Sequence, residues 1–129
     1  MKIMVVDDSA VMRKIIRRAL RETEFSGAEV IDASDGSDAL KKYEIEKPDW
    51  VLCDWNMPNM TGIEFVKGAR QLETTNHVPI IMVTTEGTMG KMEEALNEGV
   101  DSYIVKPFTG EALNRTLTKV AERNGLSIF

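Results

Sequence analysis

Five short apolar runs alternate along the chain with longer stretches in which apolar residues recur at helical spacing. The runs are rich in β-branched and aliphatic residues, and we predict one strand for each. The predicted strands are Lys2–Val6, Ala28–Ala33, Trp50–Cys53, Pro79–Thr84 and Ser102–Val105. Because strands and amphipathic stretches alternate, the pattern is typical of repeated strand–helix units that build a parallel sheet.

The amphipathic stretches carry the start and stop signals of helices. Ser9 is a good N-cap, Thr61-x-x-Glu64 fits a capping box, and Gly99 suits a helix C-terminus. We predict helices from Ser9 through Leu20, from about Ser37 to just before Pro48, from Thr61 through Ala69, from about Thr88 to Glu98, and from about Thr109 to just before Gly125. The apolar stripe of the first helix is predicted to comprise Val11, Met12, Ile15, Ile16, Ala19 and Leu20.

Five such units predict an α/β fold, a doubly wound sheet of five parallel strands with helices on both faces. Right-handed crossovers are nearly obligatory in such a sheet. The strand order 2-1-3-4-5, as in flavodoxin-like folds, is expected because the first and third strands end in acidic residues and should be neighbours at the switch point. Residues 1–129 are expected to form a single domain with no separate output domain.

Charged residues follow three of the predicted strands at their carboxyl ends. Asp7 and Asp8 close the first strand, Asp54 closes the third, and Lys106 closes the fifth. Ligands bind outside the carboxyl ends of strands in open α/β sheets, so these side chains should converge. Two carboxylates about 4 Å apart repel by roughly 4 kcal/mol at an effective dielectric constant of about 20. The cluster therefore predicts a divalent cation, and the lysine predicts an anionic guest. We interpret the acidic cluster as a Mg²⁺ site, and the anionic guest as a phosphoryl group carried by Asp54.

Composition narrows the classes of function. The net charge of −5 argues against nucleic acid as the direct partner. The single cysteine, Cys53, cannot form an internal disulfide and is expected to be buried, which suits a reducing cytoplasm. No apolar stretch reaches the roughly 18 residues of a membrane span, so no membrane association is expected.

Four motifs in this order resemble a response-regulator receiver domain of two-component signalling, in particular the single-domain chemotaxis type. They are Val5-Val6-Asp7-Asp8-Ser9, the run from Asp54 to Gly62 (DWNMPNMTG), Thr84 at the end of the fourth strand, and Tyr103-x-x-Lys106-Pro107-Phe108. Each motif is weak alone, but together, at matching separations over the full length, they are highly specific. The chain departs from many receivers at Thr61, where they have Asp, and Thr61 keeps the N-cap role.

The resemblance implies a role for each site residue. Asp54 would accept the phosphoryl group, and Asp8 and Asp54 would bind Mg²⁺ (or Mn²⁺ in its place) directly. Asp7 would act largely through water, and Asn56 would offer its backbone carbonyl. Lys106 would pair with the phosphoryl oxygens and, before modification, with Asp54, and the Lys106–Pro107 bond would be cis.

The resemblance also implies a switch and a set of partners. The Thr84 hydroxyl would close on the phosphoryl group, and Tyr103 would rotate into the space that Thr84 vacates. The upstream partner would be a CheA-like histidine kinase, and the downstream partner a flagellar motor switch protein or other output protein, with a phosphatase as a further partner. A monomer is expected. A phosphorelay intermediate, which passes the phosphoryl group to a histidine phosphotransfer protein, is the alternative.

Several features allow two interpretations. The basic side of the first helix is either a solvated face or a docking surface for an acidic kinase; it comprises Arg13, Lys14, Arg17, Arg18 and Arg21. Met89, Met92 and Leu96 have core spacing, although the resemblance places Met92 and Leu96 on an output face. His77, the only histidine, is expected on the surface.

Two rival classes fit the residues less well. A haloacid-dehalogenase-type phosphatase needs Asp-x-Asp after the first strand, and here the third position is Ser9. A flavin-binding module needs a phosphate-cradling loop after the first strand, where Asp8-Ser9-Ala10 supplies a carboxylate and no glycine.

Overall fold

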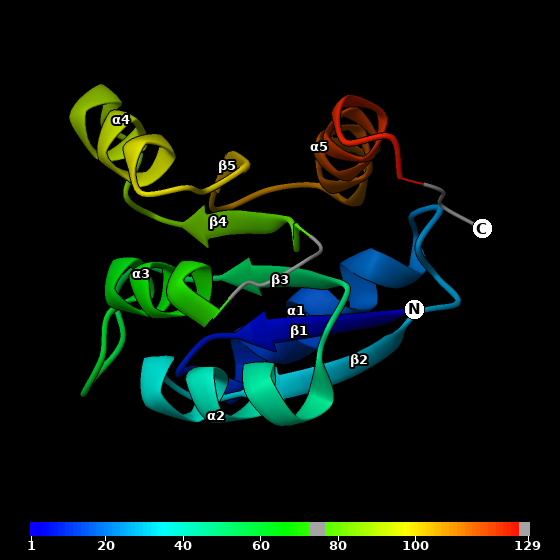
Figure 1. Cartoon of the computed structure of the whole chain (residues 1–129). Helices are drawn as coiled ribbons and strands as arrows, with labels where there is room; N and C mark the ends of the chain where they lie inside the picture. Colours follow the sequence, from blue (N-terminus) through cyan, green and yellow to red (C-terminus); the bar gives the residue numbers. More distant parts are fainter. Residues whose placement is uncertain (73–76, 127–129) are drawn as a thin grey trace.

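Strands and helices alternate from one end of the chain to the other in the computed structural model, which describes residues 1–72 and 77–126 (Figure 1). The strands are β1 (Lys2–Val6), β2 (Glu29–Ala33), β3 (Trp50–Cys53), β4 (Ile80–Thr84) and β5 (Ser102–Val105). The helices are α1 (Ala10–Arg21), α2 (Gly36–Glu46), α3 (Gly62–Leu72), α4 (Met89–Asn97) and α5 (Gly110–Arg123).

The strands form one parallel sheet in the order β2-β1-β3-β4-β5, as the sequence predicts. β1 lies between β2 and β3, so the acidic ends of β1 and β3 are neighbours. β4 begins one residue later than predicted, because Pro79 has no N–H to donate, although its carbonyl accepts from Val51 N at 3.0 Å.

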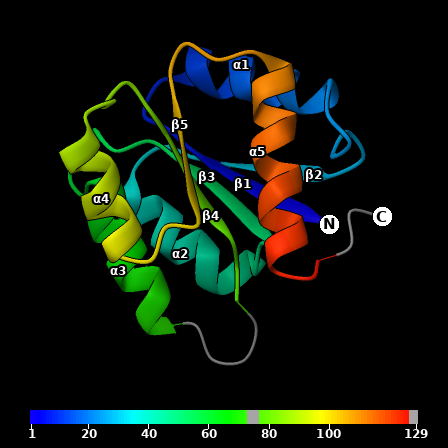
Figure 2. The same cartoon turned by 90° about the horizontal axis from the view of Figure 1, so that it is seen from above.

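The sheet separates two hydrophobic cores. Alternate residues of each strand point to opposite faces, so Met4 and Val6 belong to one core while Ile3 and Val5 belong to the other. Figure 2 shows α1 and α5 over one face and α2, α3 and α4 over the other. Phe65 anchors α3 in the first core, and Leu113 anchors α5 in the second. The four residues Ile3–Val6 of β1 are fully buried. Because both faces of the strand are covered, β1 is a continuous apolar run in the sequence.

The apolar stripe of α1 is narrower than the sequence suggests. Ile16 and Leu20 are buried against the sheet, but Val11 and Ile15 are 68% and 48% exposed. At about 100° per residue, these two side chains lie roughly 140° and 100° around the helix from Ile16. The prediction that they belong to the core-facing stripe was therefore wrong.

The core interpretation of α4 was also wrong. Met89 and Leu96 are 72% and 50% exposed, and Met92 is partly buried. Ala95 is the residue of α4 that is buried in the core. Met89 and Leu96 are therefore surface side chains, and for Leu96 this agrees with the alternative interpretation.

Arg70 joins the loops at the amino ends of β4 and β5. Its guanidinium donates to the carbonyls of Gly99 (2.8 and 3.0 Å) and Val78 (2.7 Å) and to Asp101 Oδ2 (2.9 Å). Asp101 Oδ2 also accepts from Ile80 N at 2.8 Å. Gly99 has a φ of 105°, which its missing Cβ permits. The turn after α4 is thus fixed to α3 at this end of the molecule.

His77 is exposed, as expected, and its Nε2 lies 2.6 Å from Asp101 Oδ1. Among the helices that the structure describes, none is long and apolar enough to cross a membrane.

Candidate functional site

Three carboxylates meet at the carboxyl end of the sheet, where the sequence predicts them. Asp7, Asp8 and Asp54 each offer an oxygen, and these oxygens lie within 4.8 Å of one another. Asp7 is buried, Asp54 is partly buried and Asp8 is exposed, so the cluster opens to solvent on one side. Carboxylate oxygens are ligands that Mg²⁺ prefers, and the open side leaves room for the waters that it retains. The donor set therefore fits a hard divalent cation.

Backbone hydrogen bonds that extend the sheet ladder hold two of the carboxylates in place. Asp7 N donates to Ala33 O (3.1 Å), and Asp54 N donates to Val6 O (2.9 Å). Ser9 N donates to Asp7 Oδ1 (2.9 Å) and fixes its rotamer. The acids follow their strands directly, so the register of the sheet sets the geometry of the cluster.

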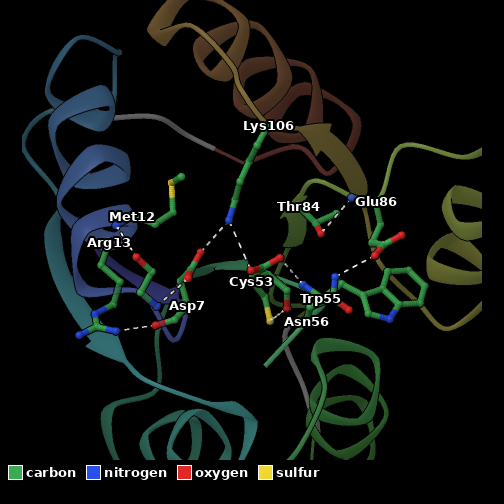
Figure 3. Close-up of polar contacts among 11 residues, drawn as sticks. Asp7, Met12, Arg13, Cys53, Trp55, Asn56, Thr84, Glu86 and Lys106 are labelled. Carbon is green, nitrogen blue, oxygen red and sulfur yellow. Dashed lines mark hydrogen bonds and ion pairs between the residues drawn. The ribbon is translucent and has the colours of Figure 1, made fainter. Parts of the chain in front are cut away.

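Lys106 reaches into the cluster from the end of β5 (Figure 3). Its Nζ lies 2.8 Å from Asp7 Oδ2 and 3.4 Å from Asp54 Oδ2, and its side chain is 9% exposed. The expected pairing with Asp54 is present, but the shorter contact is to Asp7, which the sequence analysis did not anticipate. The Lys106–Pro107 bond is cis, which confirms that prediction. Lys106 neutralises part of the charge that the three carboxylates bring together.

Lys106→Met is expected to lower the free energy of unfolding of the metal-free protein by about 3 kcal/mol, because it leaves nearly buried carboxylates without their cation. Urea denaturation in the presence of a chelator measures the loss. Lys41→Met, at an exposed lysine of α2, is the matched control and should change stability little. Equal stability of the two variants would contradict the role given to Lys106.

The β3–α3 loop fits closely around Asp54. Trp55 N donates to Asp54 Oδ1 (2.7 Å), and Gly62 N donates to Trp55 O (2.9 Å). A Cβ on Gly62 would lie 2.1 Å from the Asp54 carbonyl oxygen, so only glycine permits this approach of α3. Thr61 and Glu64 form the predicted capping box at the start of α3, with contacts of 3.2 and 3.1 Å.

Glu86 organises the rim of the site on the β4 side, a role that the sequence analysis missed. Its carboxylate accepts from the Asn56 side-chain amide (2.8 Å), and its N–H donates to the hydroxyl oxygen of fully buried Thr84 (3.3 Å). Its carbonyl accepts from the Tyr103 hydroxyl. Figure 3 places Thr84 and Asp7 on opposite sides of the site, with the Lys106 ammonium between them. The position of Glu86, two residues after Thr84, is the signal that could have identified it.

Tyr103 is held in its protonated form. Burial, with the carboxylates of Glu86 and Asp54, raises its pKa from 10.0 to about 12. Since the pKa in the folded state lies above that of the unfolded chain, the stabilisation is complete below pH 10 and is lost as the pH rises toward 12. In a Tyr43→Phe background, tyrosinate absorbance should therefore appear near pH 12 in the folded protein and near pH 10 in denaturant. Ionisation at the same pH in both states would contradict the environment described for Tyr103.

Cys53 lies fully buried beneath the cluster, as expected. Its thiol donates to the Asp54 carbonyl at 3.2 Å. Burial, reinforced by the negative charges of Asp54 and Asp7, raises the pKa of this thiol. Cys53 therefore stays protonated and does not add a thiolate to the candidate metal ligands.

The basic side of α1 divides into two parts. Arg13 and Arg17 form ion pairs with Asp32 (3.6 and 2.5 Å), and Arg13 also donates to the Asp7 carbonyl (Figure 3). The other basic residues of this side are exposed: Lys14, Arg18 and Arg21. The interpretation as a solvated face therefore does not hold for Arg13, which supports Asp7 from the α1 side, and the interpretation as a docking surface stays a prediction.

The fold and the cluster at its carboxyl edge are those of a signalling receiver. Residues 3–118 match the family described as the response regulator receiver domain, and the chain belongs to this family. It is thus a receiver domain of two-component signal transduction.

Among its relatives are chemotaxis proteins. The chain is 41% identical over 123 residues to the chemotaxis protein CheY of Pseudomonas aeruginosa, covering 95% of this chain and 98% of that protein. It is 42% identical to CheY-3 of Vibrio cholerae, covering 95% and 93%. The structure of the chemotaxis response regulator CheY4 of Vibrio cholerae matches with a TM-score of 0.82 at 39% identity, covering 92% of this chain and 97% of that one. The chain is therefore CheY-like in both sequence and fold.

Proposed function

We propose that the chain accepts a phosphoryl group on Asp54 from the phosphohistidine of a histidine kinase. The observation that carries this proposal is the convergence of three carboxylates, with oxygens within 4.8 Å, and the ammonium of Lys106. An acidic cluster alone suits a cation, but the added lysine suits an anion beside that cation. Both charges are needed where a phosphoryl group approaches a carboxylate.

The chemistry is a phosphoryl transfer between two nucleophiles. An oxygen of the ionised Asp54 carboxylate attacks phosphorus, the P–N bond of the donor breaks, and the imidazole leaves with the bond's electron pair and takes up a proton. Asp54 becomes an acyl phosphate. The protein contributes mainly positioning and charge neutralisation. Trp55 N–H donates to the acceptor carboxylate, and Lys106, whose Nζ lies 3.4 Å from Asp54 Oδ2, would pair with the transferred oxygens.

Mg²⁺, or Mn²⁺ in its place, would neutralise charge on the phosphoryl oxygens when bound. Asp8, Asp54 and the Asn56 backbone carbonyl would be its direct ligands, and Asp7 would act largely through water. Both carboxylate oxygens of Asp7 already accept hydrogen bonds, from Lys106 Nζ and from Ser9 N. This suits an indirect role for Asp7.

The output would be a change of protein-binding surface around α4, β5 and α5. Thr84 would close on the phosphoryl group through a charge-assisted hydrogen bond, and Tyr103 would move with it. Their common partner Glu86 supports this coupling. The names of the relatives support a chemotaxis setting, with a CheA-like kinase upstream, a flagellar motor switch protein downstream, and a phosphatase to end the signal.

The test is incubation with acetyl phosphate, with and without Mg²⁺, followed by intact mass measurement. One phosphoryl group should be gained with metal, and almost none with a chelator. A wild-type chain that gains no phosphoryl group in either condition would overturn the proposal. Binding to a motor switch protein, rather than transfer to a histidine phosphotransfer protein, would separate the chemotaxis role from the phosphorelay alternative.

A further inference from the structure

The chain from Glu86 to Lys91, which joins β4 to the first turn of α4, is tethered to the rest of the site by three contacts, one from β5 and two from the β3–α3 loop. The Tyr103 hydroxyl donates to the Glu86 carbonyl, and the Asn56 amide donates to the Glu86 carboxylate at 2.8 Å. The third contact is the ammonium of Lys91, which lies 4.7 Å from the centroid of the Trp55 ring. The first two contacts hold the loop, and the third holds the first turns of α4.

Trp55 connects this third contact directly to the acceptor carboxylate. It follows Asp54 in the chain, and its N–H donates to Asp54 Oδ1 at 2.7 Å. Its side chain is only 6% exposed, so its position is well defined. In Figure 3 the indole points away from the acidic cluster and toward α4. A shift of the indole that carries the Trp55 backbone with it would therefore disturb both the contact with α4 and the hydrogen bond to Asp54.

The ring contact matters because the amino end of α4 has few other contacts to hold it. Ala95, in the second turn, is its buried core residue, and the amino end of α4 has Gly87 just before the helix and Gly90 in its first turn. An ammonium within about 6 Å of an indole centroid is attracted by the ring's negative face, and tryptophan is the best partner for such a contact. Lys91 is partly buried, which limits the screening of this attraction by water.

We propose that Lys91 is a positioning residue of the site. It fixes the Trp55 indole under α4, and through the Trp55 backbone it couples the position of the α4 amino end to the orientation of the Asp54 carboxylate. The inference rests on the proposed function for its kinetic consequence, but the Lys91–Trp55 contact itself does not depend on it.

Three variants test the inference. Lys91→Met removes the charge and keeps an unbranched side chain, and Lys91→Arg keeps a cation that can lie over the ring. Lys119→Met, at an exposed lysine of α5, removes the same charge far from the indole and is the matched control. The emission of Trp55 is obtained for each by subtracting the spectrum of the corresponding Trp55→Phe protein, which leaves Trp50 in place.

In the metal-free protein, Lys91→Met should change the emission of Trp55 and make it more accessible to acrylamide. Amide hydrogen exchange in residues 86–92 should become faster. Phosphorylation by acetyl phosphate with Mg²⁺ should slow by about two- to five-fold, the range that an exposed cation–π contact supports. Lys91→Arg should keep all four properties close to those of the wild type, and Lys119→Met should leave them unchanged.

The outcomes separate the two claims. Unchanged Trp55 emission and quenching in Lys91→Met, without metal or phosphate, would overturn the contact itself. A changed emission with an unchanged phosphorylation rate would overturn the coupling to Asp54. Wild-type protein that gains no phosphoryl group would instead overturn the proposed function, while the fluorescence and exchange measurements would still decide whether Lys91 holds the indole.

Discussion

Asp54→Asn is expected to abolish phosphoryl incorporation from acetyl phosphate in the presence of Mg²⁺. The amide oxygen is a far weaker nucleophile than the carboxylate, and the substitution also removes one negative charge from the candidate metal ligands. The side chains have nearly the same shape, so Trp55 N–H can still donate to the remaining oxygen. Intact mass should show only unmodified protein at times when the wild type is largely phosphorylated.

The control for this loss is a second carboxylate outside the site. Asp49 accepts from Lys2 N at 2.8 Å at the opposite end of the sheet, and Asp49→Asn should leave incorporation unchanged. Peptide mapping of the wild type should place the added mass on the peptide that contains Asp54. A phosphoryl group on the Asp54→Asn protein would show that another residue is the acceptor.

Gly62→Ala is expected to have the largest effect on stability among the glycine-to-alanine substitutions in this chain. The added Cβ would stand 2.1 Å from the Asp54 carbonyl oxygen, and the obstructing atom belongs to backbone that is itself fixed by the sheet. Overpacking of this kind costs typically 1–3 kcal/mol, and we expect about 3 kcal/mol because no flexible side chain can yield. Urea denaturation measures the change.

The displaced loop should also reduce phosphorylation, because the same backbone carries the acceptor. Gly90→Ala is the matched control: Gly90 also lies in the first turn of a helix, and an added Cβ meets nothing within 4 Å. That variant should be as stable as the wild type, or more stable by up to about 1 kcal/mol. Similar stabilities for the two variants would contradict the close packing of α3 on the acceptor loop.

The strands could be predicted from the sequence because their signal is local. β1, β3 and β5 begin and end at the predicted residues. In β1 and β3 this follows from burial on both faces, which gives a nearly continuous apolar run. The helix faces were predicted less well. Val11 and Met89 have the chemistry of core residues, yet each is exposed because of how its helix is rotated on the sheet. The rotation of a helix about its axis depends on the elements that pack against it, and the sequence of the helix alone does not determine it.

The site, too, has features that the sequence predicts and features that it does not. The positions of Asp7 and Asp54 follow from strand ends alone, and the order of the strands brings them together. The contacts of Lys106 with Asp7 and of Lys91 with Trp55 join segments that are far apart in the chain. Their geometry is set by loop conformation and by competition among several partners, so residue types and spacing do not determine it.

The clamp that Arg70 makes on Gly99 gives α4 a fixed pivot. Two guanidinium contacts to the Gly99 carbonyl and the buried Ala95 hold the carboxyl end of the helix, whereas its amino end is joined to the site through the contact of Lys91 with Trp55. If α4 moves, it should swing as a lever about Gly99 rather than slide. Met89 would then travel farther than Leu96, so a spectroscopic label at position 89 should register a change in the site that a label at position 96 barely detects.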